Sequence, residues 1–510
     1  MTERPVVVTA AGAVRGRDDG RVAAWRGIRY AEPPTGVRRW RAPVPAAPWA
    51  GVVDTARFAP AAPQRPNPSV PLDPGSEARM DEDCLFLNVV RPSAPAPSGA
   101  LRPVMVWVHG GAYALGATSQ LVYRGDVLAA EEDVVVVTLG YRLGALGFLH
   151  LRSAGVEEAE TNVALRDVLL GLRWVRDNIR AFGGDPEEVT VFGQSAGAGI
   201  VTALLASPAA AGLFQRAIAQ SPPAGSMYGP ERSATVARRF VEHLSALAEG
   251  DPRSAPAEAV VEAGAAVYAE IPREHPGMLA FAPLVGDDLL PEAPLRVLSA
   301  GRGLPVPLVI GTNRDEATLF RLMRSPLLPI RREALQRMFA TMQAERERDG
   351  ESALPPPGRV RAVYPRSGSA LGVRVATDIA FRLPALWVAA GHAHLTPTFL
   401  YRFDFAPPLL RLTGIGAAHA TDLPYVWGEF GGLPHDPSFL LGGRSAAAAV
   451  SRRVRGRWAA FARTGTPGDG WPPYDADSRR SLVIDRQDRE ADDLDAALRA
   501  GWGEEVLAFG

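Results

Sequence analysis

Lysine is absent from the sequence, so all 55 basic residues are arginine, and neither a Schiff-base lysine nor a lysine general base is available. The lone cysteine, Cys84, excludes an intramolecular disulfide and a cysteine-based metal site. No run of about 18 apolar residues occurs, and the first residues, MTERPVVVTA, lack the apolar core of a signal peptide. We therefore expect a cytoplasmic protein without a membrane span.

The sequence also lacks an excess of charge of one sign, since it has 55 basic and 56 acidic residues and a net charge of −1. A chain without a basic excess is not expected to bind nucleic acid. Hydrophobic residues make up 47% of the chain and charged residues 22%, which excludes a disordered or coiled-coil protein. The length of 510 residues, taken alone, favours three or four domains of roughly 100–200 residues each.

Short apolar runs alternate with helical patterns along the first half of the chain. Val104–Val108 and Val134–Leu139 are β-branched and end close to glycine, as expected of buried parallel strands. Asn162–Ala181 carries apolar residues at helical spacing, and Val189–Phe192 predicts a strand before the helix Ala196–Leu205. This alternation predicts an α/β fold with a mostly parallel central sheet flanked by helices, in which ligands lie at the carboxyl ends of the strands.

The clearest chemical motif is Gly193-Gln194-Ser195-Ala196-Gly197, a G-x-S-x-G pattern. A predicted strand enters this motif and a helix of small residues leaves it, which is the context of a nucleophile elbow. Such a tight turn strains the serine backbone and exposes the hydroxyl above the start of the helix, where the helix dipole favours developing negative charge. Ser195 is therefore the predicted catalytic nucleophile.

A serine nucleophile needs a base, which in hydrolases of this kind is a histidine held by a carboxylate. The chain order for this motif is serine, acid, histidine, and six of the eight histidines follow Ser195. His419 lies in the loop GIGAAHATDLP after the predicted strand Thr398–Phe403, and it is the best candidate. His435, which follows two glycines and a short turn, is the second candidate.

The acid is expected where a strand ends between the serine and the histidine. The predicted strand Val306–Ile310 leads into GTNRDEATLF, which brings two adjacent carboxylates, Asp315 and Glu316, to the ligand edge of the sheet. The residues alone do not distinguish between these two.

An oxyanion is stabilised by backbone N–H groups that no side chain obstructs. The turn His109-Gly110-Gly111-Ala112, directly after the first apolar run, supplies such groups, and the N–H of Ala196 is a further donor. His109 precedes both the serine and the acid in the chain, so we expect it to have a structural role.

Most of the chain resembles the type-B carboxylesterases, the cholinesterase-like branch of the α/β hydrolases. The resemblance rests on six blocks: RGIRYAEPPTGVRRWRAPVPAAPWAGVVDT, EDCLFLNV, FGGDPEEVTVFGQSAGA, GTNRDEATLF, HATDLPYVWG and FARTGTPGDGWPPYD. It implies an α/β-hydrolase fold. Because the motifs are spread along one sheet, we expect a single domain over residues 1–510, with helical insertions over the active site at about residues 224–283 and 325–357.

The resemblance also implies roles for individual residues. It selects Glu316 as the acid and His419 as the base, and it assigns the oxyanion N–H groups to Gly111, Ala112 and Ala196. Further residues have supporting roles in relatives: two structural ion pairs, Arg39 with Glu82 and Arg142 with Asp167, and a serine that supports the acid, Ser221.

Departures from the family pattern bear on specificity and compartment. Ala112 replaces a glycine of the HGGG stretch, which disfavours esters of bulky tertiary alcohols, and Gln194 replaces a glutamate found in many relatives. The loop Gln64–Asp83 has no aromatic residue, so choline esters are expected to be poor substrates because their ammonium group finds no cation–π partner. Cys84 stands where secreted relatives form a disulfide, and Ala62 occupies its partner position, which fits a reducing compartment.

These residues together predict a serine hydrolase that acts through an acyl-enzyme on uncharged carboxylic esters, with a small-molecule ester as its partner. No metal and no organic cofactor is expected. Amide hydrolysis, carbamate hydrolysis and acyl transfer use the same triad and are alternatives, as is a non-catalytic binding protein of the same fold. The sequence leaves both a monomer and a homodimer open.

Overall fold

The computed structural model describes residues 4–67, 80–96, 99–348, 350–364, 369–430, 436–503 and 506–507. The strands of its main sheet are, in chain order, β3 (Arg17–Asp18), β4 (Val22–Arg29), β6 (Phe86–Pro92), β7 (Arg102–Val108), β8 (Val135–Leu139), β9 (Gly184–Gln194), β10 (Arg216–Gln220), β11 (Leu308–Asn313), β12 (Thr398–Phe403), β13 (Ser481–Ile484) and β14 (Arg489–Ala491). A small second sheet holds β1 (Val6–Val8), β2 (Ala13–Arg15) and β5 (Val52–Asp54).

The main sheet has eleven strands in the order β14-β13-β12-β11-β10-β9-β7-β8-β6-β4-β3. Every pair from β8 through β7, β9, β10, β11 and β12 to β13 is parallel, and the pairs at both edges are antiparallel. The predicted α/β fold with a mostly parallel sheet is therefore confirmed. Because the parallel strands run the same way, the loops that follow β7, β9, β10, β11 and β12 all leave from one edge.

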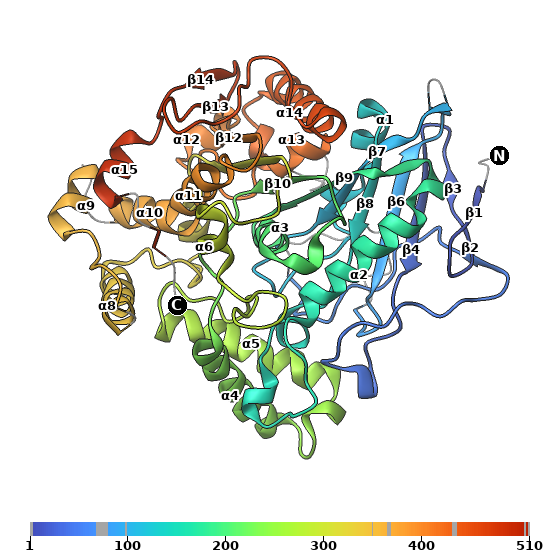
Figure 1. Cartoon of the computed structure of the whole chain (residues 1–510), viewed down its shortest axis with the longest axis horizontal. Helices are drawn as coiled ribbons and strands as arrows, with labels where there is room; N and C mark the ends of the chain where they lie inside the picture. Colours follow the sequence, from blue (N-terminus) through green and yellow to red (C-terminus); the bar gives the residue numbers. More distant parts are fainter. Residues whose placement is uncertain are drawn as a thin grey trace.

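Alternate residues of the central strands face two separate hydrophobic cores. In β7, Val104 and Val106 pack into one core, whereas Met105 and Trp107 pack into the other. The first core is covered by α2 (Val163–Asn178), α3 (Ala196–Ala206), α6 (Pro294–Ser299) and α11 (Leu383–His392), and the second by α1 (Asp126–Glu132), α13 (Leu423–Trp427) and α14 (Arg444–Thr464) (Figure 1). Burial on both faces explains why these strands are continuous apolar runs.

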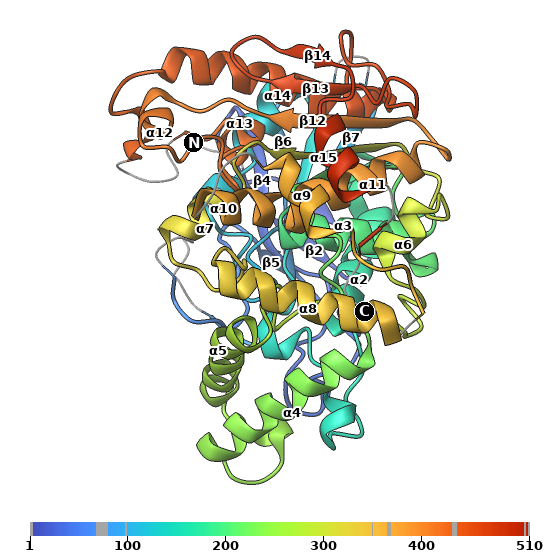
Figure 2. The same cartoon turned by 90° about the vertical axis from the view of Figure 1, so that its left-hand side faces the viewer.

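Long helices occupy the two stretches expected to be insertions. Residues 224–283 contain α4 (Pro230–Leu247) and α5 (Ala257–Glu274), which lie at the opposite end of the molecule from α14 in both views (Figures 1 and 2). Residues 325–357 contain α8 (Arg332–Arg348). The division into one domain with two insertions stays a prediction.

The remaining helices are α7 (Thr318–Leu322), α9 (Pro357–Val363), α10 (Ser369–Thr377), α12 (Pro408–Leu412) and α15 (Ala496–Trp502). A π-helical turn, Asp378–Arg382, joins α10 to α11. In the part of the chain that the structure describes, no helix is both long enough and apolar enough to cross a membrane.

Both ion pairs implied by the family resemblance are formed. Arg142 Nε lies 2.8 Å from Asp167 Oδ2 and Arg142 Nη2 lies 2.6 Å from Asp167 Oδ1, and the Asp167 side chain is fully buried. Arg39 Nε lies 2.7 Å from Glu82 Oε2, and Arg39 Nη1 also donates to the carbonyl of Ala255 at 2.6 Å. The first bidentate contact joins the loop after β8 to helix α2, and the second joins two loops 43 residues apart.

We expect Arg142→Met to lower the free energy of unfolding by about 3–5 kcal/mol, because it leaves the buried Asp167 carboxylate without its counter-charge. Burial raises the pKa of Asp167 and the Arg142 charge opposes that rise, so the variant raises the pKa further. When the pKa of a carboxyl group is higher in the folded state than in the unfolded state, the free energy of unfolding falls as the pH rises past the unfolded pKa, about 4. Urea unfolding at several pH values between about 4 and 7 measures this loss of stability.

The double variant Arg142→Met with Asp167→Leu is the control, because it removes both charges and should recover much of the lost stability. A deficit of Arg142→Met that does not grow with pH would contradict the buried charge as its cause.

Candidate active site

The serine motif forms a sharp turn between β9 and α3. Ser195 has φ 57° and ψ −128°, a strained conformation for a residue with a side chain. Its backbone N–H donates to the carbonyl of Gln220, the last residue of β10, at 2.9 Å. A Cβ at Gly197 would lie 2.0 Å from the carbonyl oxygen of Val108 at the end of β7, so only glycine permits α3 to approach this closely. The predicted elbow geometry is therefore present at the carboxyl ends of three adjacent strands.

The predicted base and acid meet at this edge of the sheet. His419 Nδ1 lies 2.6 Å from Oε2 of Glu316, whose side chain is fully buried. The other carboxylate oxygen, Oε1, accepts hydrogen bonds from the Ser221 hydroxyl at 2.6 Å and from the Asn313 backbone N–H at 2.7 Å. Three donors, one at the end of β11 and two in the loops after β10 and β12, thus hold one carboxylate.

The neighbouring carboxylate, Asp315, points elsewhere. Its Oδ2 accepts from the backbone N–H of Ala417 at 3.1 Å and from Arg314 Nε at 3.0 Å. Between the two acids that the sequence left open, the geometry brings Glu316 and not Asp315 to the histidine.

The second ring nitrogen of the histidine contacts the residue before the serine. His419 Nε2 lies 3.2 Å from Nε2 of Gln194, and the rings of Phe381 and Phe320 pack against the imidazole with centroids 4.7 Å and 5.3 Å away. With the Nδ1–H donated to the acid, the free Nε2 lone pair accepts from the amide, which is the tautomer that a general base requires. Among the described residues, the Ser195 hydroxyl makes no hydrogen bond, with His419 or with any other residue.

The turn after β7 lies against the serine. A Cβ at Gly110 would lie 3.1 Å from Ser195 Cβ. Gly111 has φ 121° and Ala112 has φ 50°, so the alanine adopts the left-handed conformation that costs a residue with a Cβ about 1–2 kcal/mol. Within the described part of the chain, the N–H groups of Gly111, Ala112 and Ala196 donate to no other protein group, so all three are free for a ligand oxygen.

The serine opens into a small cavity of about 60 Å³, here called the serine cavity. It is enclosed by Ala112, Tyr113, Ser195, Ala196, Pro223, Gly225, Ser226, Gly277, Leu279, Phe320, Leu327, Leu328, Pro329, Met338, Ala376, Ile379, Ala380, Phe381 and Leu507. No charged side chain is among these described residues, so the cavity suits an uncharged, compact group next to the reacting carbonyl.

A second buried carboxylate, which the sequence reasoning missed, lies beside the first. Asp422 follows His419 by three residues and accepts hydrogen bonds from Gln220 Nε2 at 2.7 Å and Asn313 Nδ2 at 3.1 Å. Burial and repulsion from Glu316 raise the pKa of Asp422, while the two amide donors oppose the rise. The sequence signal is the carboxylate in HATD, three residues after a candidate base and so within one turn of it.

The histidine of the turn after β7, His109, makes no hydrogen bond with the acid Glu316 among the described residues. His109 is buried, its Nδ1 lies 2.9 Å from the Gly110 carbonyl oxygen, and its ring stacks on Tyr141 at 4.5 Å. Burial lowers the pKa of His109 to about 4, so it is neutral at neutral pH and acts as a structural group. The second candidate base, His435, lies outside the described residues.

The lone cysteine lies in the core of the protein. Cys84 is buried with a free thiol, and burial raises its pKa far above the ordinary value, so the thiolate is strongly disfavoured. Ala62, at the position of the missing disulfide partner, is also buried. Of the loop Gln64–Asp83, expected to lack an aromatic cation site, residues 68–79 lie outside the described residues.

A mostly parallel sheet with a serine elbow after β9, an acid after β11 and a histidine after β12 defines an α/β hydrolase. The carboxylesterase family model matches residues 3–499. The chain therefore belongs to the carboxylesterase family, and it is an ester hydrolase.

Two relatives and one solved structure illustrate the match. The chain is 37% identical to the para-nitrobenzyl esterase of Bacillus subtilis (strain 168) over 491 residues, which cover 94% of this chain and 95% of that protein. It is 33% identical to the phenmedipham hydrolase of Pseudarthrobacter oxydans, over 95% of this chain and 96% of the relative. A solved PNB esterase structure matches with a TM-score of 0.85 and 34% identity, covering 98% of this chain and 99% of the other.

The contact between Gln194 and His419 predicts a pH effect. Gln194→Glu places a carboxylate where the amide now lies, 3.2 Å from the imidazole, and this charge stabilises the protonated ring. Because a protonated ring cannot act as a base, the acidic limb of kcat/KM against pH should move about one pH unit upward.

Stopped-flow or steady-state hydrolysis of a neutral ester across the pH range measures this shift. Gln194→Met is the matched control, because it removes the amide without adding a charge. An acidic limb that stays in place in Gln194→Glu would show that the amide does not contact the working base.

Proposed function

We propose that Ser195, His419 and Glu316 form the catalytic triad of this esterase. The observation that carries the proposal is the buried 2.6 Å contact between His419 Nδ1 and Glu316 Oε2, formed directly beside the strained Ser195 elbow. We also propose that the N–H groups of Gly111, Ala112 and Ala196 bind the oxyanion.

In the proposed acylation step, His419 Nε2 takes the proton from the Ser195 hydroxyl as the oxygen attacks the ester carbonyl. Before this step, His419 Nε2 must exchange its hydrogen bond with the Gln194 amide for one with the Ser195 hydroxyl. The negative charge that develops on the carbonyl oxygen is held by the three free N–H groups. The alcohol then leaves with the proton from His419, and the acyl group stays on Ser195.

In the proposed deacylation step, water replaces the alcohol and the same groups act in the reverse sense. His419 takes a proton from water, the hydroxide attacks the acyl carbonyl, and the acid product leaves as Ser195 regains its proton. Glu316 stays ionised throughout and holds the ring in the Nδ1–H tautomer, helped by hydrogen bonds from Ser221 and Asn313. The reaction uses no metal and no organic cofactor.

The substrate class that the serine cavity supports is an uncharged carboxylic ester with a compact group near the reacting carbonyl. Ala112 supports discrimination against tertiary alcohol esters, because its methyl group lines the same small space. Hydrolysis of phenmedipham is a second candidate activity, since a relative that is 33% identical over nearly the whole chain is named for it.

We further propose that the protein works in the cytoplasm. The support for this is the chemistry of its lone thiol, because Cys84 is buried and Ala62 removes the partner with which an oxidising compartment would bridge it.

The triad proposal predicts that a fluorophosphonate probe modifies Ser195 and no other serine. Ser195→Ala should abolish this labelling and should lower kcat for a short p-nitrophenyl ester by about 10⁶-fold. Mass spectrometry of the labelled peptide locates the modified residue.

Ser226→Ala is the matched control, because Ser226 lines the same cavity but makes no hydrogen bond with a histidine or carboxylate among the described residues. It should retain labelling. Wild-type labelling or hydrolysis in Ser195→Ala would overturn the assignment of the nucleophile.

A further inference from the structure

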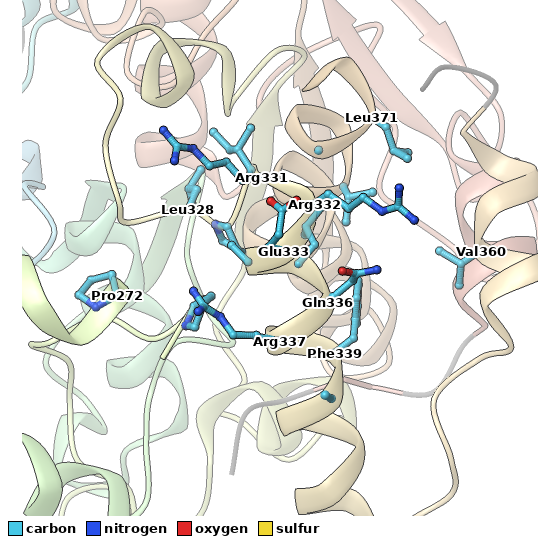
Figure 3. Close-up of a pocket in the computed structure, with 18 of the residues that line it drawn as sticks. Pro272, Leu328, Arg331, Arg332, Glu333, Gln336, Arg337, Phe339, Val360 and Leu371 are labelled. Atoms are coloured by element: carbon cyan, nitrogen blue, oxygen red, sulfur yellow. The ribbon is translucent and has the colours of Figure 1, made fainter. Parts of the chain in front are cut away.

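A much larger cavity, here called the arginine groove, lies next to the serine cavity. It has a volume of about 1450 Å³ and is built by α8, the end of α5, the segment between α7 and α8, and parts of α9, α10 and α15 (Figure 3). Phe320, Leu328 and Pro329 line both cavities. These shared residues place the groove directly beside the serine cavity.

The charges that line the groove are almost all of one sign. Among the described residues of the lining they comprise one carboxylate, Glu333, and seven guanidinium groups: Arg273, Arg321, Arg324, Arg331, Arg332, Arg337 and Arg361. None of these seven makes an ion pair with any residue that the structure describes, whereas some exposed arginines elsewhere do, such as Arg302 with Glu292 and Arg480 with Asp492. A chain of net charge −1 has thus collected unneutralised positive charge beside its reactive serine.

The arginines and the apolar lining are arranged so that an amphipathic anion fits. Arg331 and Arg337 extend to the side of α8 on which Leu328 lies, and Arg332 extends to the other side (Figure 3). Arg337 Nη2 donates to the carbonyl of Arg273 at 3.2 Å, which ties this side chain to the end of α5. The rest of the lining is largely apolar, with Leu335, Phe339, Leu371, Val375 and Trp502.

We propose that the arginine groove binds the carboxylate of an anionic ester whose reacting carbonyl lies at Ser195, an extension of the substrate class that rests on the triad proposed above. The ester bond lies in the uncharged serine cavity, a carbon chain crosses Leu328, and Arg331 and Arg337 hold the distal carboxylate. Guanidinium groups suit this role because their paired N–H donors match the two carboxylate oxygens. Hydrolysis of such an ester with water yields an alcohol and a dicarboxylate if the charge lies on the acyl side, or a monocarboxylic acid and a hydroxy-acid if the charge lies on the alcohol side.

The test compares mono-p-nitrophenyl esters of succinate, suberate and dodecanedioate with the same esters capped as methyl esters. For chains long enough to reach the groove, kcat/KM should be about fivefold higher for the anionic ester than for its capped match, the size expected of exposed guanidinium–carboxylate pairs. The ratio should fall toward one in about 0.5 M NaCl, because salt screens exposed charges. A ratio at or below one at every chain length overturns the proposal.

The double variant Arg331→Gln with Arg337→Gln should reduce this ratio to about one. Arg302→Gln is the matched control, because Arg302 is an exposed arginine outside the groove, and it should keep the wild-type ratio. General damage to the enzyme lowers both rates together and leaves the ratio unchanged, so an unchanged ratio in the double variant also overturns the proposal.

Calorimetric binding of the suberate pair to Ser195→Ala separates the groove from the triad. If the arginine groove binds the carboxylate, the anionic ester binds this variant more tightly than the capped ester even when turnover is absent. If the triad assignment alone is wrong, this binding preference persists while Ser195→Ala still hydrolyses the esters. Equal binding of the two esters contradicts carboxylate binding by the arginine groove, whether or not the triad assignment is right.

Discussion

The geometry of the site depends on one buried carboxylate, Glu316. A carboxylate without solvent is costly unless its oxygens accept hydrogen bonds, and Glu316 accepts three: from His419, from the Asn313 backbone and from the Ser221 hydroxyl. These donors come from the loop after β12, the last residue of β11 and the loop after β10. The same interaction that offsets the desolvation of the acid therefore aligns the ends of three strands and points the imidazole toward the serine elbow.

Arginine takes part in the same alignment. Arg382, in the π-helical turn between α10 and α11, donates from Nη2 to the Asn313 carbonyl at 2.7 Å and from Nε to Thr312 Oγ1 at 3.2 Å. This fixes the turn that carries Phe381 against the His419 ring. A chain without lysine thus uses the several donors of one guanidinium to hold buried oxygen atoms, while the guanidinium groups at the groove make no ion pair with the described residues.

The parts that the sequence predicted are those with local signals. The elbow at Ser195 has its glycines within two residues, and β12 has the predicted bounds because it is a short apolar run between polar loops. Strand β9 begins at Gly184, five residues before the predicted start. The sequence did not indicate these first residues because Asp185, Glu187 and Glu188 are charged and are not typical of a buried strand. The choice of Glu316 over Asp315 came from the family resemblance, since adjacent carboxylates have the same sequence signal.

The features that the sequence did not predict arise from contacts between distant segments. The Gln194 contact to His419 joins residues 225 positions apart, and the arginine groove needs α5, α8, α10 and α15 together. Neither residue spacing nor composition indicates which of 55 arginines meet around one cavity. Asp422 is an intermediate case, because its position after His419 was visible but its burial was not.

The role of the buried carboxylate is tested most directly by comparing kcat in two isosteric variants, Glu316→Gln and Asp315→Asn, on the same neutral ester. Glu316→Gln replaces one acceptor with a donor beside the His419 Nδ1–H, so kcat should fall by about 10⁴-fold. Asp315→Asn keeps an oxygen to accept from Ala417, so its kcat should stay near the wild-type value. A large loss in Asp315→Asn, or near-normal turnover in Glu316→Gln, would contradict Glu316 as the group that orients the base.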